Sequence, residues 1–110
     1  MSPPARRDVF QAIADPTRRD ILNLLVKKEL NLKTIASHFK LSRPAISQQI
    51  KILTDCGLLR IDQQGRERFC YLQTKKMKEV SDWLEPFKQA WEMRYNQLDS
   101  LLDELQSKPK

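Results

Sequence analysis

The stretch Ser42-Arg-Pro-Ala-Ile-Ser-Gln-Gln-Ile-Lys-Ile-Leu53 decides the fold of this chain. Ser42 is a favourable N-cap. Pro44 falls in the first helical turn, where the N–H group that it lacks would have no partner within the helix. The apolar residues of the stretch recur at helical spacing and predict one buried face: Ile46, Ile50 and Leu53. Gly57 supplies a favourable end for this helix.

A second, shorter helix is predicted just before this one. Apolar residues at helical spacing place it over about residues 32–39, and Asn31 is a candidate cap. Ala36 is small enough to let the following helix approach closely. Together with a three-residue turn, the two helices predict a helix-turn-helix over about residues 32–56, a motif whose second helix enters the major groove of DNA.

The polar side of the second helix has the chemistry of a base-reading surface. It carries no Asp or Glu between Ser42 and Lys51, whereas an ordinary solvated helix mixes charges of both signs. Gln and Ser can read base edges, Arg and Lys bind guanine or phosphate, and Ala can contact a thymine methyl group. We therefore expect double-stranded DNA as the partner, contacted by Ser42, Arg43, Ala45, Ser47, Gln48, Gln49 and Lys51. An amphipathic helix with an ordinary polar face is the alternative.

A basic β-hairpin follows the helix-turn-helix. Two short strands are predicted within about residues 58–73, on either side of a turn in which Gly65 can adopt a positive φ. Arg66 and Arg68 lie at or beside the tip. Next to a recognition helix such a hairpin predicts a wing, whose arginines reach phosphate or the adjacent minor groove. A solvated turn is the alternative.

The last third of the chain predicts two helices. A short one covers residues 75–84, and Pro86 restarts a longer one over about residues 86–105. Trp91 and Leu98 belong to an apolar stripe along the longer helix, which a small core cannot fully cover, so a second copy of the chain is the expected cover. A ligand pocket among the aromatic residues is the alternative: Trp83, Phe87 and Trp91.

Composition narrows the class of protein. The 110 residues have room for one domain, residues 1–110, with a net charge of +6. Residues 1–78 carry sixteen Lys and Arg against seven Asp and Glu, whereas residues 79–106 carry two against seven. The basic part suits a polyanion, although a solvated basic surface is the alternative. No apolar run could be a signal peptide or a membrane span, and no catalytic motif is present, so we expect a cytoplasmic protein that is not an enzyme.

Three segments carry a family resemblance. Ala14-Asp-Pro-Thr-Arg-Arg19, the stretch from Ser42 to Leu53, and Cys56-Gly-Leu-Leu59 with its hairpin resemble the ArsR/SmtB family of winged-helix bacterial repressors. The resemblance covers about residues 6–105. It implies a mainly α winged helix-turn-helix fold with a small β-hairpin. It also implies a homodimer formed by the first and last helices, which binds an imperfect inverted repeat in a promoter.

The resemblance extends the candidate site in both directions. Thr17 and Arg18 are expected to hold phosphates with Lys51, and Arg66 and Arg68 to extend the footprint. The implied dimer interface consists of Val9, Phe10, Ile13, Phe87, Trp91, Tyr95, Leu98 and Leu102. The closing helix is similar to the autorepressor branch of the family rather than to its metal sensors.

Two departures from the family matter. Lys40 stands where the family usually has Gly after the first motif helix, so the turn is either left-handed at a cost of about 1 kcal/mol or distorted. Asn31 and Lys33 stand where arsenic-type sensors carry two cysteines, and the last helix has no His. We therefore expect no metal and no cofactor, with an unknown effector.

Two thiols leave alternatives open. Cys56 and Cys70 are expected to be buried and inert, but oxidation of either could disturb the recognition helix or the wing. A thiol-responsive repressor is therefore one alternative function, and a winged-helix protein-interaction module is another. His38 is the only histidine and is expected at the surface.

Overall fold

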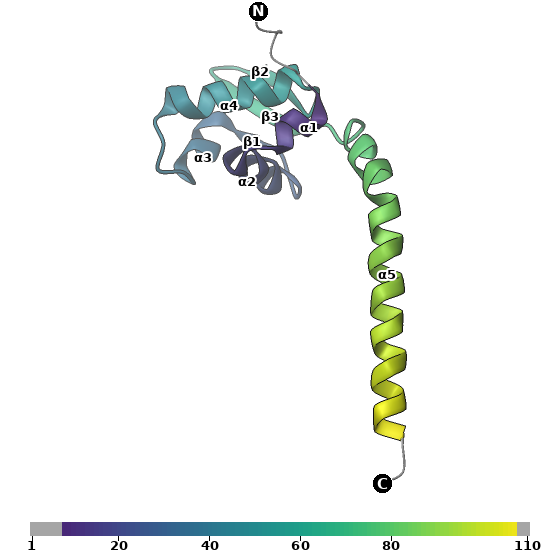
Figure 1. Cartoon of the computed structure of the whole chain (residues 1–110). Helices are drawn as coiled ribbons and strands as arrows, with labels where there is room; N and C mark the ends of the chain where they lie inside the picture. The colour runs from purple at the N-terminus through teal and green to yellow at the C-terminus, as the bar shows by residue number, and fades with distance from the viewer. Residues whose placement is uncertain (1–7, 108–110) are drawn as a thin grey trace, which may run out of the picture. The chain divides into compact units, whose positions relative to one another are not determined.

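A computed structural model describes residues 8–107 of the chain (Figure 1). Residues 1–7, whose sequence predicts no signal peptide, lie outside the described residues. The chain divides into two compact units, one that ends at Val80 and one that begins at Ser81, and each is described by itself. Within the described residues, no helix has the length and the hydropathy needed to cross a membrane.

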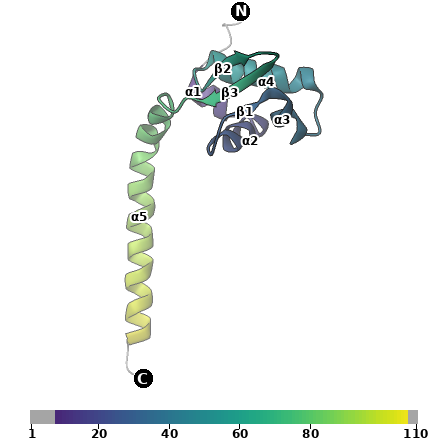
Figure 2. The ribbon, with the colours of Figure 1, turned by 180° about the vertical axis from the view of Figure 1, so that it is seen from behind.

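The predicted helix-turn-helix, hairpin and C-terminal helical segment are present in the predicted order. The first unit has an additional short strand, and the two helices predicted at the C-terminal end form one. The elements are α1 (Val9–Ile13), α2 (Pro16–Leu25), β1 (Leu30–Asn31), α3 (Leu32–Ser37), α4 (Arg43–Asp55), β2 (Leu59–Gln64), β3 (Glu67–Leu72) and α5 (Met77–Ser107). In the first unit, α4 lies against one face of the β2–β3 hairpin, as the front and back views agree (Figures 1 and 2). This is the winged helix-turn-helix fold that the sequence predicts.

Side-chain caps start the helices of this unit. Asp15, Asn31 and Ser42 each accept a hydrogen bond from the backbone N–H three residues later, at 3.1, 2.7 and 3.2 Å. Pro16 occupies the first position of α2, where its missing N–H costs no hydrogen bond. The two caps that the sequence analysis names, Asn31 and Ser42, are therefore confirmed. Gly57 ends α4 with a φ of +81°, a conformation that favours glycine.

The sheet has three strands, whereas the sequence predicts two. β3 is the central strand, with β2 on one side and the two-residue β1 on the other. Leu30 faces Cys70 and Asn31 faces Phe69 across the extra pairing. Two residues cannot show the alternation that identifies a strand, so β1 carries no readable pattern. In the hairpin turn Gly65 has a φ of +64°, as a type II′ turn requires at its first central position.

The core of the first unit draws on every helix of that unit and on the sheet. The buried face predicted for α4 is confirmed, because Ile46, Ile50 and Leu53 are each at most 2% exposed. Val9 is also in this core at 1% exposed. It therefore packs inside its own chain, which differs from the expectation that it faces a partner subunit. Phe10 and Ile13 of the same helix remain exposed and partly exposed, respectively.

The connection between α3 and α4 is longer than predicted. It spans residues 38–42, five residues rather than three, because α3 ends at Ser37. No non-glycine residue in the described part of the chain has a positive φ, so Lys40 is not left-handed. The longer, differently shaped turn removes the conformational strain that Lys40 would otherwise cause.

One helix replaces the two that were predicted at the C-terminal end. α5 runs without a break from Met77 to Ser107, with Pro86 inside it. The rings of Trp83 and Phe87, whose centroids are 5.0 Å apart, contact each other across the position of this proline. Such a contact between residues four apart stabilises a helix, and the flanking residues are mostly good helix formers. These contributions offset part of the cost of the hydrogen bond that proline cannot donate.

Candidate DNA interface

The recognition helix α4 presents its polar side to solvent as the sequence predicts. Arg43, Ser47, Gln48 and Lys51 are exposed, and Ala45 is half-buried. Ser42 is also exposed, but its hydroxyl oxygen already accepts the N–H of Ala45. A phosphate could still accept a hydrogen bond from that hydroxyl, because the cap uses only an acceptor position.

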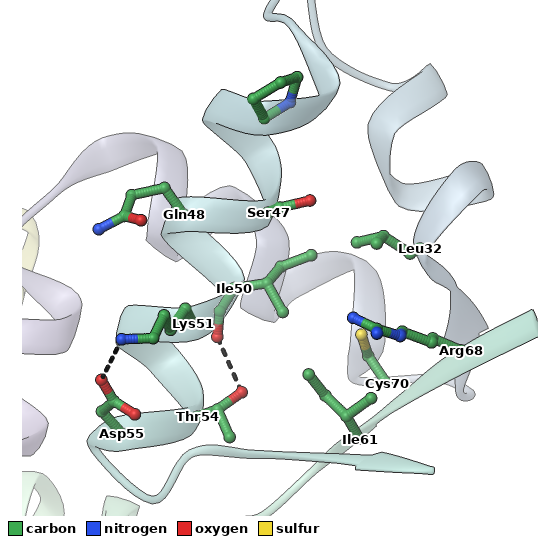
Figure 3. Close-up of a pocket in the computed structure, with 11 residues that line it drawn as sticks. Leu32, Ser47, Gln48, Ile50, Lys51, Thr54, Asp55, Ile61, Arg68 and Cys70 are labelled. Atoms are coloured by element: carbon green, nitrogen blue, oxygen red, sulfur yellow. Dashed lines mark hydrogen bonds and ion pairs between the residues drawn. The ribbon is translucent and has the colours of Figure 1, made fainter. Parts of the chain in front are cut away.

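A groove of about 490 Å³ separates α4 from strands β2 and β3 (Figure 3). Its polar rim on α4 includes Ser47, Gln48 and Lys51. Its apolar floor is formed by Leu32, Ile50, Ile61 and Cys70. Arg68 points from β3 toward α4 in this view. The helix and the wing therefore share one continuous surface, with polar groups at its mouth.

A second hollow, of about 300 Å³, gathers positive charge beside the first. It is lined by Lys33, Arg43, Arg66 and Arg68, with Asn31, Leu32 and the single carboxylate of Glu67. The cations come from the start of α3, the start of α4 and the wing. Sequence reasoning treated Lys33 only as a residue that would repel a metal, because its distance from the wing is not visible in the sequence.

Lys51, one of the predicted contacts on α4, takes part in an ion pair. Its Nζ lies 3.8 Å from a carboxylate oxygen of Asp55, one turn later, and the side chains are 71% and 41% exposed. Exposed pairs of this kind contribute little to stability. Lys51 can therefore exchange Asp55 for a phosphate at small cost. Thr17 is half-buried at the start of α2.

Arg18 is buried, whereas a phosphate contact would need an exposed side chain. It is 8% exposed, and its guanidinium donates three hydrogen bonds within the chain. The acceptors are the backbone carbonyl of Ala12 at 2.8 Å, that of Gln11 at 3.0 Å, and Oε1 of Gln49 at 2.8 Å. Gln49 is consequently half-buried and engaged, unlike its neighbour Gln48.

Both cysteines are buried thiols, as the sequence predicts. Cys56 lies at the end of α4, and Cys70 lies on the central strand. Burial raises the pKa of the Cys70 thiol, because a thiolate is poorly solvated there. A thiol that stays protonated is a weak nucleophile, which favours the inert interpretation.

The second unit, as far as it is described, presents an exposed apolar face. Every predicted interface residue of α5 is between 44% and 68% exposed: Phe87, Trp91, Tyr95, Leu98 and Leu102. Trp83, Met93, Leu101 and Leu105 are also exposed. A helix with this many exposed large side chains is typical of an interaction surface.

Metal-binding groups are dispersed across the described residues. No group of three His, Cys, Asp or Glu side chains comes together there. His38 is exposed after α3, with Nδ1 2.9 Å from the carbonyl oxygen of Thr34. Asn31 accepts the N–H of Thr34 as the cap of α3, so it serves the helix at the place where a sensor would carry a thiolate.

Known proteins match both the sequence and the fold. A family model described as "Bacterial regulatory protein, arsR family" matches residues 15–60. The transcriptional repressor SdpR of Bacillus subtilis is 35% identical over 77 residues, which cover 70% of this chain and 86% of SdpR.

Solved structures give the same result. A crystal structure of an ArsR family transcriptional regulator superimposes with a TM-score of 0.67 at 35% identity, covering 76% of this chain and 86% of that one. HlyU of Vibrio cholerae superimposes with a TM-score of 0.61 at 26% identity, covering 72% and 86%. SdpR and the ArsR family regulator are transcriptional regulators and not enzymes, as expected for this chain. The protein is therefore a DNA-binding transcriptional regulator that belongs to the ArsR family.

Proposed function

We propose that the protein is a homodimeric repressor that binds an imperfect inverted repeat in a promoter, without a metal. The observation that carries the proposal is the pairing of two surfaces on one chain. The exposed side of α4 and the wing offers hydrogen-bond donors and positive charge. The exposed side of α5 offers large apolar side chains. One surface suits DNA and the other suits a second copy.

The DNA surface supports a two-groove contact. Gln48 and Ser47 are exposed on α4 and can read base edges in the major groove. Arg66 at the hairpin turn can reach phosphate or the next minor groove. Lys33 and Arg43 lie with the wing arginines around the basic hollow, where a backbone phosphate between the two grooves would fit. Arg18 is left out of this contact set because it is buried.

The apolar face of α5 supports the dimer. Its residues recur at steps of four and three, the spacing with which two helices pack along a common seam. Two identical subunits related by a two-fold axis would present two copies of α4, so the preferred site would be a near-palindrome. Occupation of such a site in a promoter blocks transcription. The function places the protein in the cytoplasm of a bacterium, where its DNA lies.

Selection of bound sequences from random duplex DNA tests the proposal directly. The wild-type chain should enrich a motif with two inverted half-sites, whose centres lie about one helical turn or a multiple apart. The matched control is Gln48→Ala with Ser47→Ala, which should retain general DNA affinity but lose enrichment at the base pairs those residues read. A single, unrepeated half-site would contradict the dimer. The absence of any enriched motif would contradict sequence-specific binding altogether.

A further inference from the structure

A buried guanidinium connects the first helix to the recognition helix. Arg18 of α2 donates to the carbonyl oxygens of Gln11 and Ala12, in the last turn of α1, and to Oε1 of Gln49 on α4. The carbonyl of Gln11 also accepts the N–H of Ala14, at 3.3 Å, and a cation beside the last carbonyls of a helix is favourable. The two backbone contacts, at 2.8 and 3.0 Å, therefore fix the position of the guanidinium.

This contact dictates which end of the Gln49 amide faces the protein. A guanidinium has five N–H donors and no acceptor, so only the amide oxygen of Gln49 can bind it. Among residues 8–107, the hydrogen bond of the Gln49 side chain is the one that its oxygen accepts from Arg18, which leaves the amide nitrogen without a partner there. Within the described residues, no side-chain nitrogen or oxygen is both buried and unpaired. The nitrogen of Gln49 is therefore open to solvent, while its oxygen faces the nearly buried Arg18.

We propose that Arg18 is a specificity-determining positioning residue, which presents Gln49 to DNA as a hydrogen-bond donor only. This inference rests on the proposed function, because it assumes that α4 reads a major groove. An unrestrained glutamine binds adenine with two bonds, donating to N7 and accepting from the N6 amino group. Arg18 occupies one of the two lone pairs of the Gln49 oxygen and turns this oxygen toward the protein, so that only the amide nitrogen, the donating half of that pair, faces solvent. A donor alone matches guanine best, because guanine offers two neighbouring acceptors, O6 and N7, and it also matches O4 of thymine. Adenine offers only N7, next to an amino group that then has no acceptor on Gln49.

Arg18 therefore moves the preference at one base pair from adenine to guanine or thymine. The same contact predicts that Gln48, which has an exposed amide and no such restraint, keeps the full glutamine preference for adenine. Two adjacent glutamines on one helix would then read different bases, a difference that sequence alone does not reveal.

The test compares base preferences of variants after selection from random duplex DNA. Gln49→Met first identifies the base pair that Gln49 reads, as the one position whose preference disappears. The wild-type chain should prefer guanine or thymine there. Arg18→Met should shift that position toward adenine, with a change in the base ratio of about tenfold, and leave the other positions unchanged. In the Gln49→Met background, Arg18→Met should have no further effect on base preference.

Arg19→Met is the matched control. Arg19 is exposed and donates to the carbonyl of Ile13 at 2.8 Å, so the variant removes the same charge and a similar backbone contact without touching Gln49. Its base preferences should equal those of the wild type. Circular dichroism establishes that each variant is folded before selection.

The outcomes separate this inference from the function on which it rests. A wild-type preference for adenine at the Gln49 position would overturn the inference even if Arg18→Met failed to fold. If folded Arg18→Met instead loses affinity equally for all sequences, with no shift in base preference at the Gln49 position, Arg18 has only a structural role. That result would also overturn the inference. Enrichment of no motif by the wild type would overturn the proposed function, and this inference with it.

Discussion

The two amphipathic helices α4 and α5 have similar apolar periodicity but opposite surroundings. On α4, Ile46 and Leu53 are completely buried, because α2, α3 and the sheet cover them within the same unit. On α5, Leu98 and Leu102 are 49% and 44% exposed. The spacing of apolar residues predicts that a helix has an apolar face. It does not predict whether the cover is part of the same chain.

This difference separates two sources of stability. The winged unit, residues 8–80 as described, gains about 25 cal/mol for each Å² of apolar surface that its own core removes from water. The helix from residue 81 onward has no such core in the described structure. We expect it to gain stability when a second copy of the chain covers its apolar face. The first source is independent of protein concentration, whereas association with a second copy depends on it.

The largest expected effect comes from placing a charge on the apolar face of α5. Leu98→Glu or Trp91→Glu should dissociate the dimer, because a carboxylate cannot be buried in an apolar seam without a partner. Binding to an inverted repeat should fall by at least about 100-fold, since two linked half-site contacts become two separate ones. Sedimentation equilibrium measures the mass, and fluorescence anisotropy on a labelled repeat measures affinity.

Gln89→Glu is the matched control for this charge. Gln89 is exposed on the side of α5 opposite the apolar stripe, so the variant adds the same carboxylate without touching the proposed seam. Its mass and affinity should equal those of the wild type. If the wild-type chain itself sediments as a folded monomer at micromolar concentration, the dimer is excluded.

A smaller but still large effect is expected in the core of the winged unit. Ile46→Ala should lower the free energy of unfolding by about 2–5 kcal/mol, because it leaves a cavity at a fully buried site. Val26→Ala, at a side chain that is 66% exposed, should change it by about 0.5 kcal/mol or less. Urea unfolding followed by circular dichroism measures both. Equal losses for the two variants would contradict the core assignment.

The same experiment on α5 sharpens the contrast. At protein concentrations low enough to dissociate the proposed dimer, Leu102→Ala should have little effect on the free energy of unfolding. Its effect should grow as the protein concentration rises. Ile46→Ala should show no such dependence. An effect of Leu102→Ala that is independent of concentration would mean that α5 is stabilised within its own chain.

Local signals explain what the sequence predicts well. Three kinds of predicted feature depend on residues close together in the chain: the caps Asn31 and Ser42, the turn glycines Gly57 and Gly65, and the buried face of α4. Because the physics of a cap or a turn acts within a few residues, the helix-turn-helix and the wing could both be placed correctly.

Features that depend on distant partners could not be predicted. Arg18 lies in a basic segment that resembles a phosphate contact, yet it is buried by α1 and by Gln49, which is 31 residues away. β1 exists only because β3 pairs with it. The continuity of α5 through Pro86 depends on the whole helix outweighing one lost hydrogen bond. Arg18 and β1 depend on partners that are distant in the sequence, whereas the passage of α5 through Pro86 depends on the summed contributions of many residues along the helix.

Removing a base-reading side chain from α4 should cause a loss of operator affinity that is smaller than the loss expected from disrupting the dimer. Gln48→Ala should weaken binding to the selected operator by about 1–3 kcal/mol, because the side chain is exposed and unrestrained and can form two bonds to one base. Binding to random DNA should hardly change, since non-specific affinity comes from phosphate contacts. Competition titrations with operator and random duplexes measure both, and equal losses on both would remove Gln48 from base recognition.

Phosphate contacts should produce a smaller change, visible mainly in the salt dependence. Arg66→Ala and Lys33→Ala should each make the slope of log K against log salt shallower by roughly one unit per subunit. Both residues line the basic hollow between the wing and the helix-turn-helix. Lys27→Ala removes an exposed cation that does not line this hollow, and it should leave the slope unchanged. An unaltered slope for Lys33→Ala would take α3 out of the interface.

No effect at all is expected from zinc, cadmium or arsenite, and this null result separates the DNA-binding unit from the metal sensors of its family. A transition-metal site needs three or four well-placed donors. At the arsenic-type position Asn31 caps α3, and Lys33 would repel a cation. Cys56 and Cys70 are both buried, at the end of a helix and inside a strand. Each metal is titrated into the protein–operator complex at fixed ionic strength, and anisotropy should stay constant. If DNA is released at a stoichiometric metal concentration, and is still released in the double variant Cys56→Ser, Cys70→Ser, the protein has a metal site without thiols. Release that disappears in either single variant would establish the thiol-responsive alternative.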